Sequence, residues 1–393
     1  PVVRSIPALG VLLNTELRGD SVGTRILAWS VAIESAKDYP LFGWGPNNYY
    51  YAFNQHFRPE SLEYGWAETW FDNANNIFLN TLSAQGIFGL LVYLALFVTA
   101  IVTVVKRYRQ GSVPFIMMGL SIAFLGAHVV QNIFVFENPT SYLYFFFTLA
   151  FMNGYGMKYA EVKQDVRSGK ISVGVVGGVT GLMLLFLYAT NVNPARANMA
   201  MLHAIQSIYQ GEDPITQYEK VTVISTPHID DIRNDFSRTM LDIAPQYKTA
   251  GREADARRGI EFAFKELEKN RELHPLDIRV HIQQAEQAQF LLLSTNDPAW
   301  LLAGEKILED ARRYSPSRQQ LVYMLAPVKA ALGKVDEAVA LLQHTIDEDP
   351  KIAEGWWRLA LVHEQGGLHA EALRVLQEAE GKGIVFTGSG AEV

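Results

Sequence analysis

The chain has 393 residues, no cysteine and a formal net charge of −7. Its length exceeds that of one ordinary domain, and the lack of cysteine excludes a disulfide framework and thiolate metal ligands. Residues 1–190 carry a net charge of +1 and residues 191–393 carry −8. We therefore expect a membrane half followed by an acidic soluble half, and the acidic balance argues against nucleic acid as a partner. Because the sequence begins at Pro1 without a signal-like segment, we expect it to be the C-terminal part of a longer membrane protein.

Residues 1–86 are polar, aromatic and rich in turn-forming residues. The run TRILAWSVAIESAK, Thr24–Lys37, spaces its apolar residues as a surface helix does. Two glycines, a proline and two asparagines in residues 41–50 predict a tight loop. The aromatic stretch 49–57 suits a membrane interface, where rings with polar tips are favoured. We therefore expect an interfacial segment that contains one helix.

Four apolar runs follow, at 87–105, 113–136, 141–157 and 171–190. The first has no charge and no proline, and a helix of this length is roughly 28 Å long, close to the thickness of a hydrocarbon core. The sequence therefore predicts four transmembrane helices.

Basic residues set the expected orientation of these spans. Lys106, Arg107 and Arg109 follow the first span, and four more basic residues join the third span to the fourth. The turn between the second and third spans carries only Glu137. By the positive-inside rule the basic loops are cytoplasmic, which places residues 1–86 and 191–393 on the outer face.

A 34-residue period appears near the C-terminus, where Pro316 and Pro350 are 34 residues apart. Small and apolar residues recur at matching offsets, which resembles tetratricopeptide repeats, a stack of helix pairs. The pattern is clearest over 285–384 and weakens upstream toward about 244. An unrelated array of helical hairpins is the alternative. The predicted fold is all-α: a helical membrane domain followed by an α-solenoid.

The sequence contains no nucleotide-binding glycine loop, zinc-ligand spacing or serine nucleophile elbow. The glycines of GVVGG, residues 174–178, lie inside an apolar span and favour helix packing. A basic and polar cluster remains in the outer segment: Arg18, Arg25, His56, Arg58, Asn75 and Asn76. An arginine fork matches phosphate oxygens, so an arginine at a membrane surface suits a diphosphate. Surface salt bridges, such as Arg18 with Glu16 or Asp20, are the alternative for each.

Three stretches together are similar to a known family. The runs TRILAWSVAIESAKDYPLFGWGPNNY, WFDNANNIFLNTLSAQGIFGLLVYLALF and VVQNIFVFENPTSYLYFF resemble the C-terminal half of the O-antigen ligase and polymerase superfamily, in members that end in tetratricopeptide repeats. That resemblance implies a glycosyltransferase that moves a glycan from a polyprenyl diphosphate carrier to an acceptor on the outer membrane face. The matching positions are Arg25, Trp29, Pro40, Phe42, Gly43, Gly45, Asn76, Leu79, Gly86 and Gly89.

The resemblance also implies roles for single residues. Arg25 inherits contact with the diphosphate, and Glu137 occupies a position that is acidic in the family. The family histidine, a candidate base, is replaced by Asn75, and an expected acidic position is Ala84. An amide does not titrate near neutral pH, so Asn75 can offer hydrogen bonds only. His56 is a possible substitute base, although a structural role is the alternative.

Polar residues also fall inside the second span, near its outer end: His128, Gln131 and Asn132. They either line a pathway or join helices by hydrogen bonds. We expect Arg25, Asn75, Asn76, Glu137 and His56 to serve catalysis. We expect Arg18, Arg58, Trp29 and Gln131 to bind substrate.

The sequence therefore predicts a multi-pass protein of the cytoplasmic membrane that uses a polyprenyl diphosphate-linked glycan. The acceptor would be a lipid, a glycan or a protein, and the repeats could bind a protein partner. We expect no cofactor and no metal, because the arginines can neutralise the leaving group. The alternative is a non-catalytic anchor whose repeats recruit envelope proteins. A transporter subunit is disfavoured, because four spans show no inverted repeat.

Overall fold

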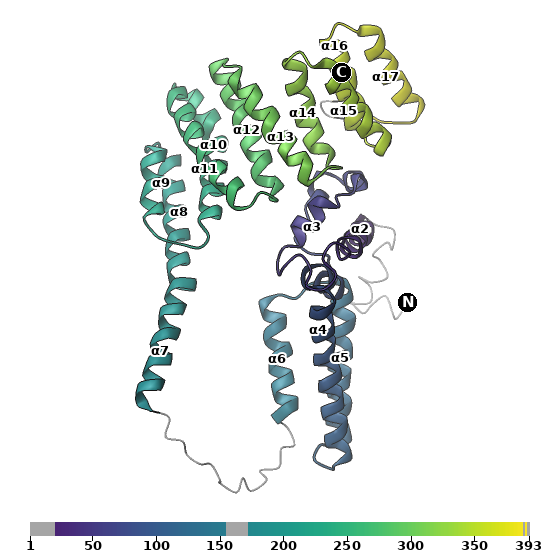
Figure 1. Ribbon diagram of the computed structural model, residues 1–393, viewed down its shortest axis with the longest axis vertical. Helices are drawn as coiled ribbons and strands as arrows, with labels where there is room; N and C mark the ends of the chain where they lie inside the picture. Colours follow the sequence, from purple (N-terminus) through teal and green to yellow (C-terminus); the bar gives the residue numbers. More distant parts are fainter. Residues whose placement is uncertain (1–19, 155–171, 388–389, 391–393) are drawn as a thin grey trace, which may run out of the picture. The chain divides into compact units, whose positions relative to one another are not determined.

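The computed structural model describes residues 20–154, 172–387 and 390. The chain forms two compact units, Pro1–Asp165 and Val166–Val393. Every regular element within the described ranges is helical (Figure 1), so the all-α prediction is confirmed.

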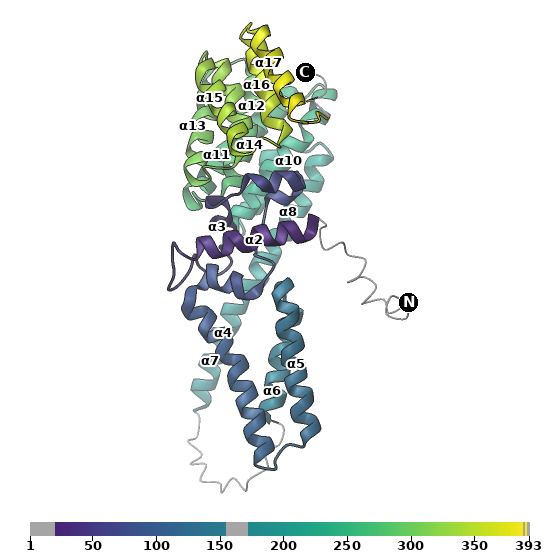
Figure 2. The same ribbon diagram turned by 90° about the vertical axis from the view of Figure 1, so that its right-hand side faces the viewer.

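Unit 1 places short helices at one end of a set of long ones. The helix expected at 24–37 is α2, Asp20–Ser35, and the aromatic stretch after it forms α3, Tyr49–Gln55. Two short 3-10 turns follow, Pro59–Tyr64 and Trp66–Thr69. The long helices are α4 (Ile77–Arg109), α5 (Phe115–Phe134) and α6 (Pro139–Gly154). Helix α2 runs across the end of α4 (Figure 2).

An aromatic core holds α2 in place. One face of α2 packs against α3 and the segment before α4, and the buried members of this core are Ala28, Val31, Ala32, Tyr49, Phe53, Phe57, Phe71 and Ala74. The Tyr49 hydroxyl donates a 2.6 Å hydrogen bond to the Ala28 carbonyl. Burial raises the pKa of this hydroxyl, so it remains a donor. The core therefore fixes the helix that carries Arg25.

Helix α4 is interrupted at Gly86, which adopts φ 66° and ψ −169°. The loop predicted at 41–50 crosses this break and pairs with it through backbone atoms. Trp44 N–H donates to the Ser83 carbonyl (3.0 Å), Gly45 N–H to Ala84 (2.8 Å), and Ile87 N–H to Pro40 (2.9 Å). The second part of α4 therefore begins at Ile87, which is also the predicted start of the first span.

The break depends on glycine, because a Cβ atom at Gly86 would lie 2.3 Å from the Leu41 carbonyl carbon. We expect Gly86→Ala to destabilise unit 1 by on the order of 3 kcal/mol, since it adds a backbone clash to a conformation that L-residues avoid. Thermal unfolding in detergent measures the effect. Gly119→Ala is the matched control, because a Cβ there meets open space inside α5 and should be neutral or stabilising. Equal melting temperatures for the two variants would contradict the prediction.

Within the described ranges, three helices are long and apolar enough to cross a membrane: Ile77–Arg109, Phe115–Phe134 and the continuous helix Val173–Tyr209. The third predicted span corresponds to α6, whose 16 residues end where the described range ends. The chain is therefore a multi-pass membrane protein, and the count of four spans stays a prediction.

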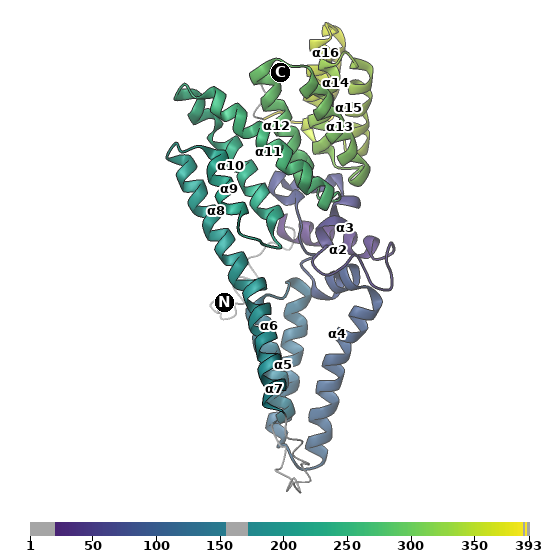
Figure 3. The ribbon, with the colours of Figure 1, turned by 60° about the vertical axis from the view of Figure 1, so that its left-hand side comes forward.

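Unit 2 begins with helix α7 (Val173–Leu187), a π-helical turn (Tyr188–Val192) and α8 (Asn193–Tyr209), which run on without a gap. Helix α9 (Pro214–Thr222) folds back on α8. Eight helices then stack as successive hairpins (Figures 1 and 3): α10 (Ile229–Thr249), α11 (Glu253–Leu273), α12 (Ile278–Thr295), α13 (Ala299–Tyr314), α14 (Gln319–Ala331), α15 (Val335–Glu348), α16 (Ala353–Gln365) and α17 (His369–Gly381).

The last two hairpins show the 34-residue period directly. Helix α16 starts 34 residues after α14, and α17 starts 34 residues after α15. Helices α10 and α11 have 21 residues each, against 13 and 14 for α14 and α15. The period fades upstream because longer helices change the spacing while the stacking continues.

Candidate functional site

Arg25 lies half-buried on α2. It makes no hydrogen bond or ion pair with another residue of the described ranges. Trp29 lies one turn further along the same helix face. Its ring is 6.2 Å from that of Phe134, the last residue of α5, and its buried indole N–H has no acceptor among the described residues. Arg25 and Trp29 therefore offer unused donors near the end of α5.

The other basic residues predicted for this region are neutralised. Arg58 forms an ion pair with Glu34 in the last turn of α2. The His56 Nε2 atom lies 2.6 Å from Asp38 Oδ2, and its Nδ1 atom lies 3.9 Å from Glu34 Oε1. These pairs form one charged cluster after the C-terminal end of α2. Arg18 lies outside the described residues.

The asparagine-rich segment before α4 forms a capped turn. The Asn76 side chain is the N-cap of α4, since its Oδ1 atom accepts hydrogen bonds from Phe78 N–H (3.0 Å) and Leu79 N–H (3.1 Å). Asn75 has φ 50°, a conformation that asparagine tolerates, and its backbone N–H donates to Asn73 Oδ1 at 2.9 Å. Asn76 is thus occupied by the backbone, whereas the Asn75 side chain makes no hydrogen bond within the described ranges.

Glu137 is the centre of a polar network just after the C-terminal end of α5. Its side chain is 1% exposed, and its Oε1 atom lies 2.7 Å from His128 Nε2. Asn132 Nδ2 donates to the same oxygen at 2.6 Å, and the Tyr93 hydroxyl lies 3.4 Å from it. Ser141 Oγ donates to the other carboxylate oxygen. These hydrogen bonds come from α4, α5 and α6. They join the three helices and satisfy the buried carboxylate.

Aromatic rings enclose this network. The His128 ring stacks on Phe145 with centroids 4.5 Å apart and planes at 6°. Phe97 and Phe124 each lie 6.1 Å away. His128 is therefore held in place between these rings. Sequence reasoning found Glu137 and His128 but missed Tyr93 and Ser141, which are ordinary residues in their own segments.

Two ring contacts connect the predicted site residues to this network. Phe78, in the turn after Asn75, lies 5.8 Å from the Tyr93 ring. On the other side, Trp29 contacts Phe134. The face of α2 that carries Trp29 thus borders the end of α5, and Phe78 contacts Tyr93, whose hydroxyl accepts a hydrogen bond from Asn132 of α5. Gln131 is exposed on α5, and no contact within the described ranges joins it to the network.

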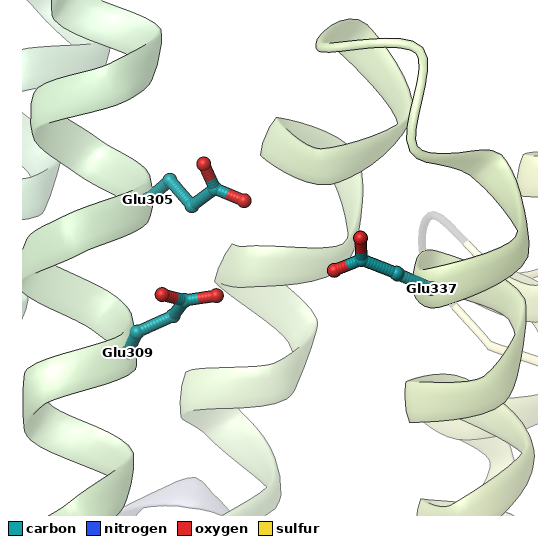
Figure 4. A group of neighbouring side chains, drawn as sticks. All are labelled: Glu305, Glu309 and Glu337. Carbon is teal, nitrogen blue, oxygen red and sulfur yellow. The ribbon is translucent and has the colours of Figure 1, made fainter.

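A second charged cluster lies in unit 2, where Glu305 and Glu309 of α13 and Glu337 of α15 point toward one space (Figure 4). Their oxygens could hold a cation, and Lys329 supplies one. Its buried Nζ atom lies 2.9 Å from Glu305, 2.7 Å from Glu309 and 2.7 Å from Glu337. The ammonium group occupies the place that a metal would take, so the cluster joins three helices of the solenoid.

This cluster should make the solenoid sensitive to acid. The hydrogen bonds from Lys334 and Lys329 hold the pKa of Glu305 below its ordinary value of 4.5, against the effect of burial. Because the folded pKa is the lower one, the stabilisation is complete above about pH 4.5 and is lost as pH falls through the folded value. We expect the protection factors of amide exchange in α13–α15, corrected for the intrinsic pH dependence of exchange, to fall below pH 4.5, and Glu305→Gln to flatten that fall. An unchanged pH profile in the variant would contradict this assignment.

Comparison with known proteins adds to the geometry. Residues 3–94 match the family described as O-antigen ligase, and residues 323–384 match the tetratricopeptide repeat. No curated protein matches the chain. Among solved structures, one titled "Crystal structure of MamA protein" has 19% identity and a TM-score of 0.31, and the match covers 47% of this chain and 90% of that one. A second MamA structure has 20% identity and a TM-score of 0.28, over 45% and 92% of the two chains.

The two family matches cover different parts of the chain, and both agree with the sequence resemblance. The O-antigen ligase match spans α2, α3, the Asn75 turn and α4 as far as residue 94, beyond the break at Gly86. The repeat match spans α14–α17, apart from the first residues of α14. The chain therefore carries a segment that matches the O-antigen ligase family in its membrane half, and a segment that matches tetratricopeptide repeats near its C-terminal end.

Proposed function

We propose that this chain belongs to a membrane glycosyltransferase that moves a glycan from a polyprenyl diphosphate carrier to an acceptor on the outer face of the cytoplasmic membrane. The observation that carries the proposal is the state of Arg25. It makes no ion pair within the described ranges, whereas Arg58 is paired with Glu34. An arginine that keeps its charge available at the end of a transmembrane helix set suits a phosphate-bearing lipid.

In the proposed reaction an acceptor hydroxyl attacks the anomeric carbon of the carrier-linked sugar. The bond from that carbon to the diphosphate oxygen breaks, and the leaving diphosphate gains negative charge. Arg25 would stabilise this charge with two parallel hydrogen bonds. Asn75, whose side chain is unused within the described ranges, would donate a hydrogen bond to a phosphate or a sugar oxygen.

The acceptor proton requires a base, and the amide of Asn75 is unable to accept it. The Nε2 atom of His56 lies 2.6 Å from Asp38 Oδ2, whereas its Nδ1 atom lies 3.9 Å from Glu34, beyond hydrogen-bond distance, and could take the proton. The Glu137 carboxylate is paired with His128, and the Tyr93 hydroxyl lies 3.4 Å from it. We propose His56 for the proton transfer, since Asp38 can stabilise the imidazolium that forms, and Glu137 for holding the helix ends.

The solenoid would present a surface to the acceptor or to a protein partner. A second candidate function follows from Asn75, where the family places a histidine: a membrane-anchored scaffold without transferase activity, whose repeats recruit envelope proteins.

One experiment separates the two functions. The full-length protein, in its native membranes, would receive a radiolabelled polyprenyl diphosphate-linked glycan from the same cells. The transferase proposal predicts loss of the labelled donor and release of polyprenyl diphosphate, compared with membranes that lack the protein. Unchanged donor in both membranes would contradict the proposal and favour the scaffold.

A further inference from the structure

The last span and the solenoid share one helix. Helix α7, the π-helical turn and α8 run continuously from Val173 to Tyr209. No residue of α7 is buried within unit 2, and its sequence carries no charged residue. In contrast, α8 buries one face in the solenoid through Ala197, Met201, Ala204 and Ile208. A single rod therefore passes from lipid into a folded domain.

The level of the bilayer surface can be placed on this rod. The apolar stretch from Val173 to Thr190 is roughly 27 Å long as a helix, close to the thickness of a hydrocarbon core. Tyr188 lies near its end, and the Arg196 guanidinium donates a 2.8 Å hydrogen bond to the Tyr188 hydroxyl. Tyrosine and arginine are typical of the interface between lipid and water. The membrane surface therefore falls between Tyr188 and Arg196.

The loop between α9 and α10, residues 223–228, is held at this level. Asn193 lies between Tyr188 and Arg196 in the sequence. Its side chain donates a hydrogen bond to the Ser225 carbonyl. Figure 1 shows this loop beside the end of α8 that continues into α7. Val223, the first residue of this loop, is 84% exposed, although α8 and α9 pack against each other.

We propose that the loop 223–228 enters the headgroup layer of the bilayer. Lipid is the occupant that fits, since the loop is fixed at the height where the rod leaves the hydrocarbon core. An apolar side chain at that depth is stabilised by leaving water. Lys220, exposed in the last turn of α9, offers its charge to lipid phosphates.

The solenoid would then touch the membrane at two points, the rod and the loop. Two attachments prevent the solenoid from turning freely about the axis of α7, so one side of it stays against the lipid. This inference does not depend on transferase activity, because it uses residues of unit 2 alone.

Labelling the cysteine-free chain tests the proposal. The full chain with Val223→Cys would carry an environment-sensitive fluorophore in vesicles of phosphatidylethanolamine and phosphatidylglycerol. We expect blue-shifted emission and several-fold stronger quenching by spin-labelled lipid than for Leu293→Cys. Leu293 is also apolar and 75% exposed, but it lies in the last turn of α12, at the opposite edge of the solenoid. Equal emission and equal quenching at the two positions would overturn the proposal.

Two further variants keep the test decisive. Ser225→Cys provides a second label site if Val223→Cys fails to fold, because only the backbone carbonyl of Ser225 takes part in the tether. Asn193→Ala removes the donor of that tether and should lower lipid quenching at residue 223 toward the value at residue 293. Quenching that is unaffected by Asn193→Ala would contradict the proposed role of Asn193 in holding the loop at the surface.

Discussion

Replacing Arg25 by alanine is expected to lower the rate of glycan transfer by about 10²–10³-fold, the usual effect of removing one preorganised donor from a developing charge. The charge of the leaving diphosphate would lose its guanidinium partner, while the fold would change little, because Arg25 makes no ion pair within the described ranges. The measurement is release of polyprenyl diphosphate by membranes that carry the full-length variant.

Two other substitutions sharpen this prediction. Arg25→Lys keeps a charge but loses the paired hydrogen bonds, so its activity should fall between the wild type and alanine. Arg58→Ala removes an arginine of the same segment that is already paired with Glu34, and it should retain most of the activity. Equal losses for Arg25→Ala and Arg58→Ala would show that the segment needs positive charge in general, and the specific role of Arg25 would fail.

Lys329→Met should destabilise the solenoid by about 1–3 kcal/mol, the cost of losing the hydrogen bonds that its buried ammonium group donates to three carboxylates. Burial opposes the charge of Lys329, but the hydrogen bonds that its ammonium group donates to Glu309, Glu337 and Glu305 outweigh it and raise the pKa of that group. Methionine keeps the apolar stem and leaves three carboxylates facing one another. Amide hydrogen exchange in α13, α14 and α15 of the full chain measures the loss.

Lys306→Met is the matched control for this variant. Lys306 lies next to Glu305 on α13, but its side chain is exposed. We expect its substitution to change the free energy of unfolding by less than about 0.5 kcal/mol. Equal protection in Lys329→Met and wild type would show that solvent, and not Lys329, compensates the three glutamates.

The general architecture was predictable because its signals are local and periodic. Apolar runs marked the long helices, and the 34-residue spacing marked the hairpins α14–α17. The break in α4 was only half predictable. The sequence placed the start of the span at Ile87, but it did not show that helix also forms from Ile77 to Gln85, because the loop 40–45 that bridges Gly86 comes from a distant segment.

The candidate site was predictable in its residues and not in their partners. Arg25 and Glu137 were identified from the family resemblance, and both lie at the end of the helix set. Sequence alone was unable to tell that Arg58 is neutralised by Glu34 while Arg25 is not, since both are arginines of one polar segment. The polar residue Asn76 suggested a ligand contact, yet its oxygen caps α4.

The bridge across Gly86 is made by backbone atoms, and every peptide unit offers the same donor and acceptor. The side chains of Leu41 and Phe42, exposed by 51% and 73%, contribute nothing to those hydrogen bonds. They can therefore be exchanged while the span stays in register, provided that Gly43 and Gly86 remain. This loop is a place where the chain can vary the surface it offers at the membrane without altering the architecture beneath.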